Sequence, residues 1–267
     1  TGPPGSGKTV VALYRTQRIY QEQGMSVDMI VYSKVLHSYI SESLNDLDMK
    51  DDARARTFHS WICKYWKRKT GQKGLPPQIE SYKYDWDEIY KILNIQNSPP
   101  EFDQLIIDEG QDLPPGFYNV APFISKSVTV FADMNQAIFE NVNTSVDFIM
   151  TSLRRFKPRE VKLRKNHRNT REIAVFSQYF KILDREVPLQ SDDLPDRRGD
   201  LPYLVKNCNF EDIINFIVQF AENKNDRRVA VLLDTKRQVN RFYENISELA
   251  DDIASVNVQS YTSGNRE

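Results

Sequence analysis

The first residues that could do chemistry form a glycine-rich loop at the start of the chain. Residues 2–9 read GPPGSGKT and fill every position of the pattern G-x-x-x-x-G-K-[ST]. Gly2, Gly5 and Gly7 let the backbone curl so that successive N–H groups, including that of Ser6, point at phosphate oxygens. A helix directly after the loop would add its positive N-terminus at the same point. The loop therefore predicts a binding site for a nucleotide phosphate chain.

Two side chains at the end of the loop complete the phosphate site. Lys8 is expected to reach the β- and γ-phosphates of ATP, and the hydroxyl of Thr9 is expected to help hold Mg²⁺. An ordinary glycine-rich turn before a helix is the alternative interpretation. The complete pattern, followed by a helical sequence, favours the nucleotide site.

A second element, which is acidic, follows about one hundred residues after the loop. Residues 105–107 (LII) form a short apolar run that ends in Asp108 and Glu109. A buried strand of this kind would deliver Asp108 to the Mg²⁺ ion, and Glu109 would then orient and deprotonate the attacking water. Apolar strands also end in acidic residues by chance, so the assignment depends on its pairing with the glycine-rich loop.

The elements that must position these residues follow a βαβα rhythm. Short apolar runs predict buried parallel strands, and apolar residues at helical spacing predict the helices between them. Strands are expected at 27–32, 105–107, 128–131, 203–205 and 229–233, and helices at 10–20, 34–44, 173–180, 211–221 and 236–249. Residues 57–66 are expected to form a turn that leads into another helix. Residues 187–202 are rich in Pro and Asp and predict a loop. We therefore expect an α/β fold with a parallel sheet and flanking helices, a first domain over 1–160 and part of a second over 161–267.

Composition adds few constraints on function. The chain has 267 residues and a formal net charge of −1, so a nucleic-acid partner would have to be held by local basic stretches. Two distant cysteines fit no disulfide framework or metal site, and no apolar run reaches the roughly 18 residues of a membrane span. These features favour a cytoplasmic protein. Because the chain opens at Thr1 without a methionine, we expect a fragment of a longer protein.

Four further segments are similar to the motif series of one helicase family. They are TFHS at 57–60, DEGQD at 108–112, FADMNQAIF at 131–139 and LRKNHRNT at 163–170. In this order after the loop, they resemble the motifs of the UvrD/Rep/PcrA-like superfamily 1 helicases. The resemblance implies two RecA-like domains that bind ATP and Mg²⁺ between them.

The resemblance also implies roles for residues around the nucleotide. Gln136 would contact the γ-phosphate, and Arg168 would be an arginine finger presented from the second domain. Gln111 would couple the nucleotide site to the nucleic acid. His167 stands where the family has a tyrosine that stacks on adenine. A turn residue and a solvated basic residue are the alternative interpretations of Gln136 and Arg168.

Candidate contacts to a single strand come from the same resemblance. Thr57 and His59 would touch a backbone phosphate, while Phe139 and Tyr32 would lie near the bases. A core position is the alternative for Phe139. Two basic stretches, 64–69 (KYWKRK) and 154–165, could hold a phosphate backbone or simply be solvated surfaces.

These features favour an ATP-driven motor that moves along single-stranded DNA or RNA, by resemblance a 3'-5' DNA helicase. An ATPase without unwinding activity, either a translocase or a switch with a protein partner, is the main alternative. A nucleic-acid-binding module with a vestigial nucleotide site would not need intact Lys8, Thr9, Asp108 and Glu109. A kinase would leave Gln136 and the segment around Arg168 unexplained.

Overall fold

The computed structural model describes residues 1–32, 40, 55–71, 73–133, 144–180, 191–223, 229–251 and 258–260. These residues divide into two compact units, Thr1–Pro202 and Tyr203–Glu267. The domain boundary expected at residue 160 therefore lies inside the first unit. The reason is that the chain just beyond it pairs with the start of the sequence, since the Leu163 N–H donates to the Thr1 carbonyl at 2.7 Å.

The first unit is built on a parallel four-stranded sheet with the order β2-β1-β5-β6. Its strands are β1 (Val27–Val31), β2 (Ala55–Thr57), β5 (Phe102–Ile107) and β6 (Ser125–Val130). The strands expected near 27–32, 105–107 and 128–131 are thus confirmed. Every strand pair is parallel, so all the carboxyl ends lie along one edge of the sheet.

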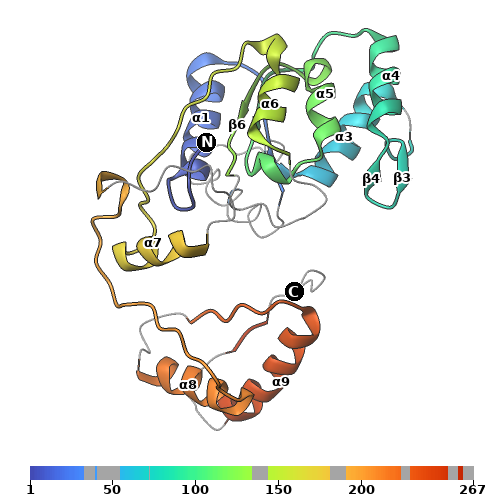
Figure 1. Ribbon diagram of the computed structural model, residues 1–267. Coiled ribbons are helices and arrows are strands. Elements are labelled where there is room, and N and C mark those ends of the chain that lie inside the picture. The colour runs from blue at the N-terminus through green and yellow to red at the C-terminus, as the bar shows by residue number, and fades with distance from the viewer. Residues whose placement is uncertain are drawn as a thin grey trace. The chain divides into compact units, whose positions relative to one another are not determined.

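Helices cover both faces of this sheet (Figure 1). One face packs on α1 (Lys8–Gln23), and the other packs on α3 (Phe58–Thr70), α4 (Trp86–Gln96), α5 (Pro115–Ile124) and α6 (Val146–Ser152). Successive strand residues point to opposite faces: Ile106 packs on the α1 side, whereas Leu105 and Ile107 pack on the α3 side. The mixed α/β fold with a parallel sheet is that of a P-loop NTPase core.

The described part of the first unit also contains shorter elements. A hairpin of β3 (Gln78–Glu80) and β4 (Lys83–Tyr84) lies between α3 and α4 in the chain. The helix α7 (Arg171–Ser177) continues into η4 (Gln178–Phe180), and three further 3-10 turns are η1 (Gly110–Asp112), η3 (Arg154–Phe156) and η5 (Ser191–Asp193). Most of the helix expected at 34–44 lies outside the described residues.

The second unit contains α8 (Phe210–Asn223) and α9 (Lys236–Asp251), as expected. Ile214 and Val218 of α8 pack against Phe242 and Ile246 of α9. The strands expected at 203–205 and 229–233 are not formed. An apolar run becomes a strand only when a neighbouring strand accepts its ladder hydrogen bonds, and no strand pairs with these runs among the described residues.

No helix in the described part of the chain is long and apolar enough to cross a membrane.

Candidate active site

The glycine-rich loop leads directly into α1. Gly5 and Gly7 have φ angles of 76° and 85°, a region that suits glycine, and Gly7 is the N-cap of the helix. At Gly5, close approach adds a second reason, because a Cβ atom there would lie 2.6 Å from Oδ1 of Asn166. The loop therefore ends at a helix N-terminus, which would favour a bound anion.

Lys8 is buried at the start of α1, with 6% of its surface exposed. Its ammonium group donates to the carbonyl oxygens of Gly2 at 2.8 Å and Pro3 at 3.2 Å. It also forms an ion pair with Asp133, whose Oδ2 lies 3.4 Å from Nζ. Lys8 is thus held inside the loop that is expected to cradle the phosphates.

Thr9 and Asp108 meet at the carboxyl end of β5. The Thr9 hydroxyl donates to Oδ2 of Asp108 at 2.7 Å, which joins the loop to the acidic element 99 positions away. The other carboxylate oxygen of Asp108 is buried and has no hydrogen-bond partner among the described residues. Mg²⁺ takes oxygen ligands, so this hydroxyl and carboxylate fit the ion predicted from the sequence.

Burial raises the pKa of Asp108 to about 6, and the neighbouring charge of Glu109 acts in the same direction. The Thr9 hydrogen bond and the charge of Lys8 oppose this shift. A buried carboxylate gains most from a cation close by, because the ion restores the stabilisation lost with water. The environment of Asp108 would therefore favour a cation bound close to its carboxylate.

Glu109 follows with a left-handed backbone (φ 52°), which turns the chain from β5 into η1. Nε2 of Gln111 donates to a carboxylate oxygen of Glu109 at 2.9 Å, and Oε1 of Gln111 accepts from the backbone N–H of Asp133 at 2.9 Å. Gly110 leaves no room for a side chain, since a Cβ would lie 2.3 Å from Cγ1 of Val130. Gln111 thus connects Glu109 to the chain just after β6.

The segment around Arg168 packs directly against the glycine-rich loop. The His167 N–H donates to the Gly5 carbonyl at 2.8 Å, and Oδ1 of Asn166 accepts from the N–H groups of Arg168 and Asn169 at 2.9 and 3.0 Å. The side chains of His167 and Arg168 are exposed. The resemblance implies that Arg168 is presented from a second domain; by its contacts, this segment lies in the unit Thr1–Pro202, bonded to the loop itself.

The predicted nucleic-acid residues have different surroundings. Thr57 pairs with Val31 at the carboxyl edge of the sheet, and the half-buried Tyr32 packs against the core. Nδ1 of His59 lies 3.2 Å from the Tyr84 hydroxyl, and its ring meets that of Tyr82 edge to face at 5.1 Å. Burial lowers the pKa of His59. Gln136 and Phe139 lie outside the described residues.

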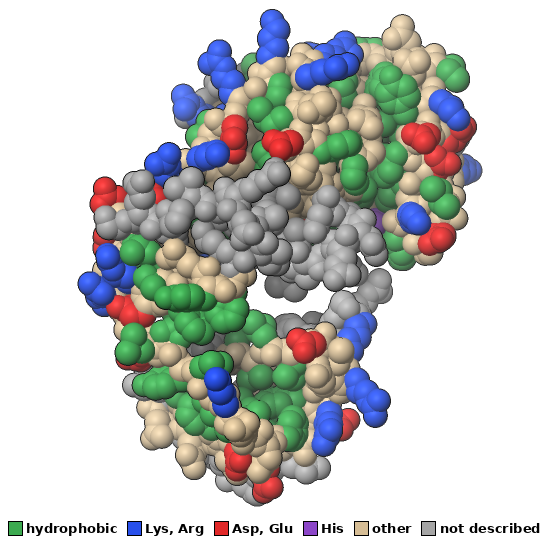
Figure 2. Space-filling model, viewed as in Figure 1, with side chains coloured by type: hydrophobic (Ala, Val, Ile, Leu, Met, Phe, Trp, Pro, Cys, Tyr) green, Lys and Arg blue, Asp and Glu red, His purple; other side chains and the backbone are tan. Residues whose placement is uncertain are grey.

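The two basic stretches differ in exposure. In the first, Tyr65 and Trp66 are fully buried, so its aromatic rings and its cations do not share a surface as the sequence suggests. Helical spacing places these rings on the face of α3 that packs on the sheet. In the second stretch six cations are exposed, namely Arg154, Arg155, Lys157, Arg159, Lys162 and Arg164. Figure 2 shows Lys and Arg side chains gathered around the upper ends of α1 and α6.

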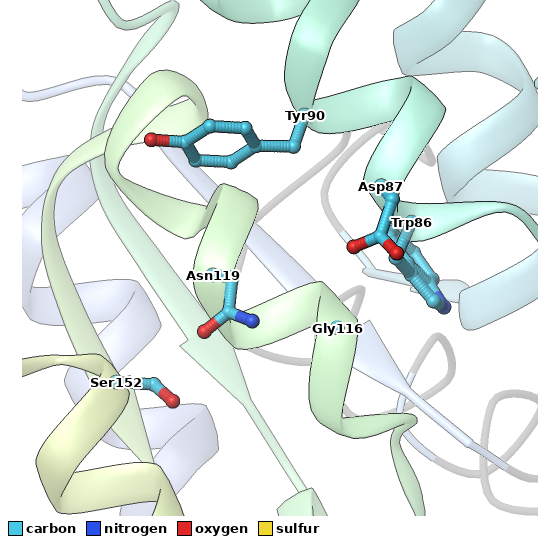
Figure 3. A pocket seen from close by; sticks show the side chains of 6 residues that line it. All are labelled: Trp86, Asp87, Tyr90, Gly116, Asn119 and Ser152. Atoms are coloured by element: carbon cyan, nitrogen blue, oxygen red, sulfur yellow. The ribbon is translucent and has the colours of Figure 1, made fainter.

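A separate pocket of about 380 Å³ lies between α4, α5 and α6 (Figure 3). Its lining consists of Trp86, Asp87, Tyr90, Gly116, Asn119 and Ser152. None of the predicted site residues lines this pocket, so the residues at the carboxyl edge of the sheet remain the candidate active site.

Asp133 is a member of this site that the sequence does not assign. Its position after the apolar run 128–131 repeats the pattern of Asp108 after 105–107, which is the available sequence signal. The contact with Lys8, 125 positions away in the chain, depends on the order of the strands.

Comparison with known families adds an independent observation. The model of the viral superfamily 1 RNA helicase core domain matches residues 80–212, a range that contains Asp108, Glu109 and Arg168. Comparison with curated proteins gave no significant match. With the glycine-rich loop and the parallel sheet, the family match supports the assignment of the chain to the superfamily 1 helicases.

Proposed function

We propose that the chain is the motor core of a UvrD-like helicase that hydrolyses ATP to move along single-stranded nucleic acid. The observation that carries the proposal is the 2.7 Å contact between Thr9 and Asp108, which joins the two phosphate-site elements. Lys8 and Glu109 flank this contact in the sequence. The side chains proposed for nucleotide binding and water activation thus come from residues next to this contact, which supports the proposal.

Each residue has a role set by its chemistry. Lys8 binds the β- and γ-phosphates, and Thr9 and Asp108 hold Mg²⁺. When bound, this ion neutralises charge that develops on the phosphates. Glu109 accepts a proton from the attacking water, and Gln111 orients the Glu109 carboxylate.

Arg168 and His167 are proposed to contact the nucleotide from the segment beside Gly5. Arg168 would stabilise the charge of the transferring phosphoryl group, and His167 would stack on the adenine. Both side chains are exposed next to the loop, which supports these roles. Gln136 keeps its proposed role as a γ-phosphate sensor on the resemblance alone.

The track is proposed to be single-stranded DNA or RNA. The matched family model describes an RNA helicase core, which favours RNA, whereas the UvrD-like motif series favours DNA and 3'-5' movement. Thr57, His59, Tyr32 and Phe139 are the proposed contacts to this strand. Its phosphate charge would also attract the exposed cations of 154–164.

ATP hydrolysis by the whole chain, measured with and without single-stranded DNA or RNA, tests the proposal. Stimulation by one polymer is expected and would identify the track. Glu109→Gln should retain ATP binding but lower turnover by about 10²–10⁴-fold, the usual contribution of a general base. Glu244→Gln on α9 makes the same chemical change outside the site and should leave turnover unaltered. ATP hydrolysis that neither DNA nor RNA stimulates would contradict the proposed motor function.

A translocase or switch without unwinding activity is the second candidate. Strand separation in the family that the motifs resemble often uses an accessory domain inserted in this part of the chain. Between α3 and α4 the hairpin is the sole regular structure among the described residues, which favours this candidate. A forked duplex distinguishes the two candidates. A helicase releases the complementary strand, whereas a translocase consumes ATP on the single-stranded arm without releasing it.

A further inference from the structure

The Lys8 side chain uses its full hydrogen-bonding capacity within the protein. An ammonium group has three N–H donors. The acceptors around Nζ are the Gly2 carbonyl at 2.8 Å, the Pro3 carbonyl at 3.2 Å and the Asp133 carboxylate at 3.4 Å. A phosphate oxygen that binds Lys8 must therefore displace at least one of these partners.

Asp133 differs from the other two acceptors because it is charged. Lys8 and Asp133 are 6% and 4% exposed, so water screens their attraction less than at the surface. A phosphate group offers Lys8 the same kind of interaction as a carboxylate does, a negatively charged oxygen. Asp133 and a nucleotide phosphate thus compete for one cation.

The backbone of Asp133 is fixed by hydrogen bonds to neighbouring elements. Its N–H donates to Oε1 of Gln111 at 2.9 Å. Two residues earlier, Phe131 donates to the Ile107 carbonyl and accepts from the Gly110 N–H, both at 2.8 Å. Lys8, by contrast, carries its charge on a flexible four-carbon stem. When a phosphate binds, Lys8 is therefore the partner that moves.

From this geometry we propose that Asp133 is a positioning residue that holds Lys8 in the loop and weakens nucleotide binding by competing with the phosphates. The inference rests on the proposed function, because it assumes that phosphates bind at the glycine-rich loop. Its consequence is faster release of ADP, since Lys8 has a charged partner to return to. Gln111 is hydrogen-bonded to both Asp133 and Glu109, so a displacement of Asp133 would also shift the Glu109 carboxylate.

Equilibrium binding of ADP with Mg²⁺, measured by calorimetry on the whole chain, tests the inference. Asp133→Asn keeps the shape but removes the charge, and it should lower the Kd for ADP about five- to tenfold and slow ADP release. A residue with a merely structural role would leave the Kd unchanged or raise it, and either result would overturn the inference. Asp147→Asn, the same change at an exposed position of α6, is the matched control.

Asp133 could also weaken ADP binding simply by repelling the phosphate charge. The same substitution in a variant that lacks the Lys8 cation separates this repulsion from competition for Lys8. In Lys8→Gln, the effect of Asp133→Asn on the Kd should fall below about twofold, because the contested cation is gone. If Asp133→Asn still lowers the Kd for ADP by the full amount in the Lys8→Gln background, Asp133 does not act by competing for Lys8. If Asp133→Asn does not fold, as judged by thermal unfolding, Asp133→Ser replaces it in both backgrounds.

The outcomes also separate the inference from the proposed function. Wild-type chain that binds ADP with the same Kd as Asp133→Asn would overturn the inference alone. Wild-type chain that binds neither ADP nor ATP would overturn the proposed function, and the inference would fall with it.

Discussion

Around the glycine-rich loop the predicted side chains meet one another, whereas the predicted nucleic-acid residues meet other parts of the protein. Thr9 contacts Asp108 directly, and Lys8 lies in the loop that would hold the phosphates. His59, by contrast, contacts Tyr82 and Tyr84 of the β3–β4 hairpin. Polar contacts organise the first region, and aromatic packing organises the second.

The difference reflects what each region is expected to bind. A phosphate chain is small and highly charged, so its site must hold donors and carboxylates in fixed positions. A single strand is long and can be held by many weak contacts, each of which tolerates some variation. Substitutions in the first region should therefore have large effects on one reaction, and substitutions in the second should have smaller effects on affinity.

A large effect is expected at Lys8. Lys8→Ala removes the cation that is proposed to contact the β- and γ-phosphates, so ATP binding should weaken and ATP turnover should fall by about 10²–10³-fold. Calorimetric titration with ATP measures the loss of binding, and a steady-state hydrolysis assay measures the loss of turnover. Lys91→Ala, at an exposed position of α4, is the control and should behave as wild type. Normal turnover in Lys8→Ala would remove the basis of the comparison.

A smaller effect is expected at His59. Because burial lowers its pKa, the imidazole is neutral at pH 7 and acts as a hydrogen-bonding group rather than a cation. His59→Ala should weaken single-strand binding by about tenfold, the energy of a hydrogen bond to a charged group. The slope of log affinity against log salt should not change, since no phosphate charge is neutralised. Fluorescence anisotropy with a labelled oligonucleotide measures both quantities.

Tyr84→Phe sharpens this test, because it removes the hydroxyl near Nδ1 of His59 and keeps the aromatic ring. An affinity within about threefold of wild type is expected if His59 contacts the strand itself. A loss as large as that of His59→Ala, or a reduced salt slope, would contradict a direct and uncharged contact.

The smallest functional effect is expected at Asp28, which is hydrogen-bonded to Trp61 of α3. Its carboxylate accepts from Nε1 of Trp61 at 2.7 Å, and burial raises its pKa to about 6 from the usual 3.8. The folded state therefore binds the proton more tightly than the unfolded state. Between about pH 4 and pH 6 the stability contributed by this group is lost as the pH rises.

Asp28→Asn keeps an acceptor for Trp61 and cannot ionise. We expect it to raise the free energy of unfolding by about 1–3 kcal/mol at pH 7, with no gain near pH 4. Urea denaturation at both pH values measures this, and ADP binding should not change. If Asp28→Asn raises the free energy of unfolding equally at both pH values, the ionisation of Asp28 is not the cause of the increase.

Short-range patterns determined much of this protein from the sequence alone. The glycine-rich loop, the helix after it and the strand that ends in Asp108 each depend on residues that are neighbours in the chain. Their backbone requirements are local, because positive φ angles and helical or alternating apolar spacing act over a few residues. For the same reason α8 and α9 were predicted close to their observed bounds.

Only the tertiary structure decided which of these local elements meet. The sequence pattern contains Asp133, but the strand order β2-β1-β5-β6 and the turn after β6 place it beside Lys8. Packing likewise turned Tyr65 and Trp66 into the core, and pairing with Thr1 and Gly5 kept residues 163–168 in the first unit. Contacts between residues far apart in the chain depend on how the whole sheet assembles, and no local pattern encodes that assembly.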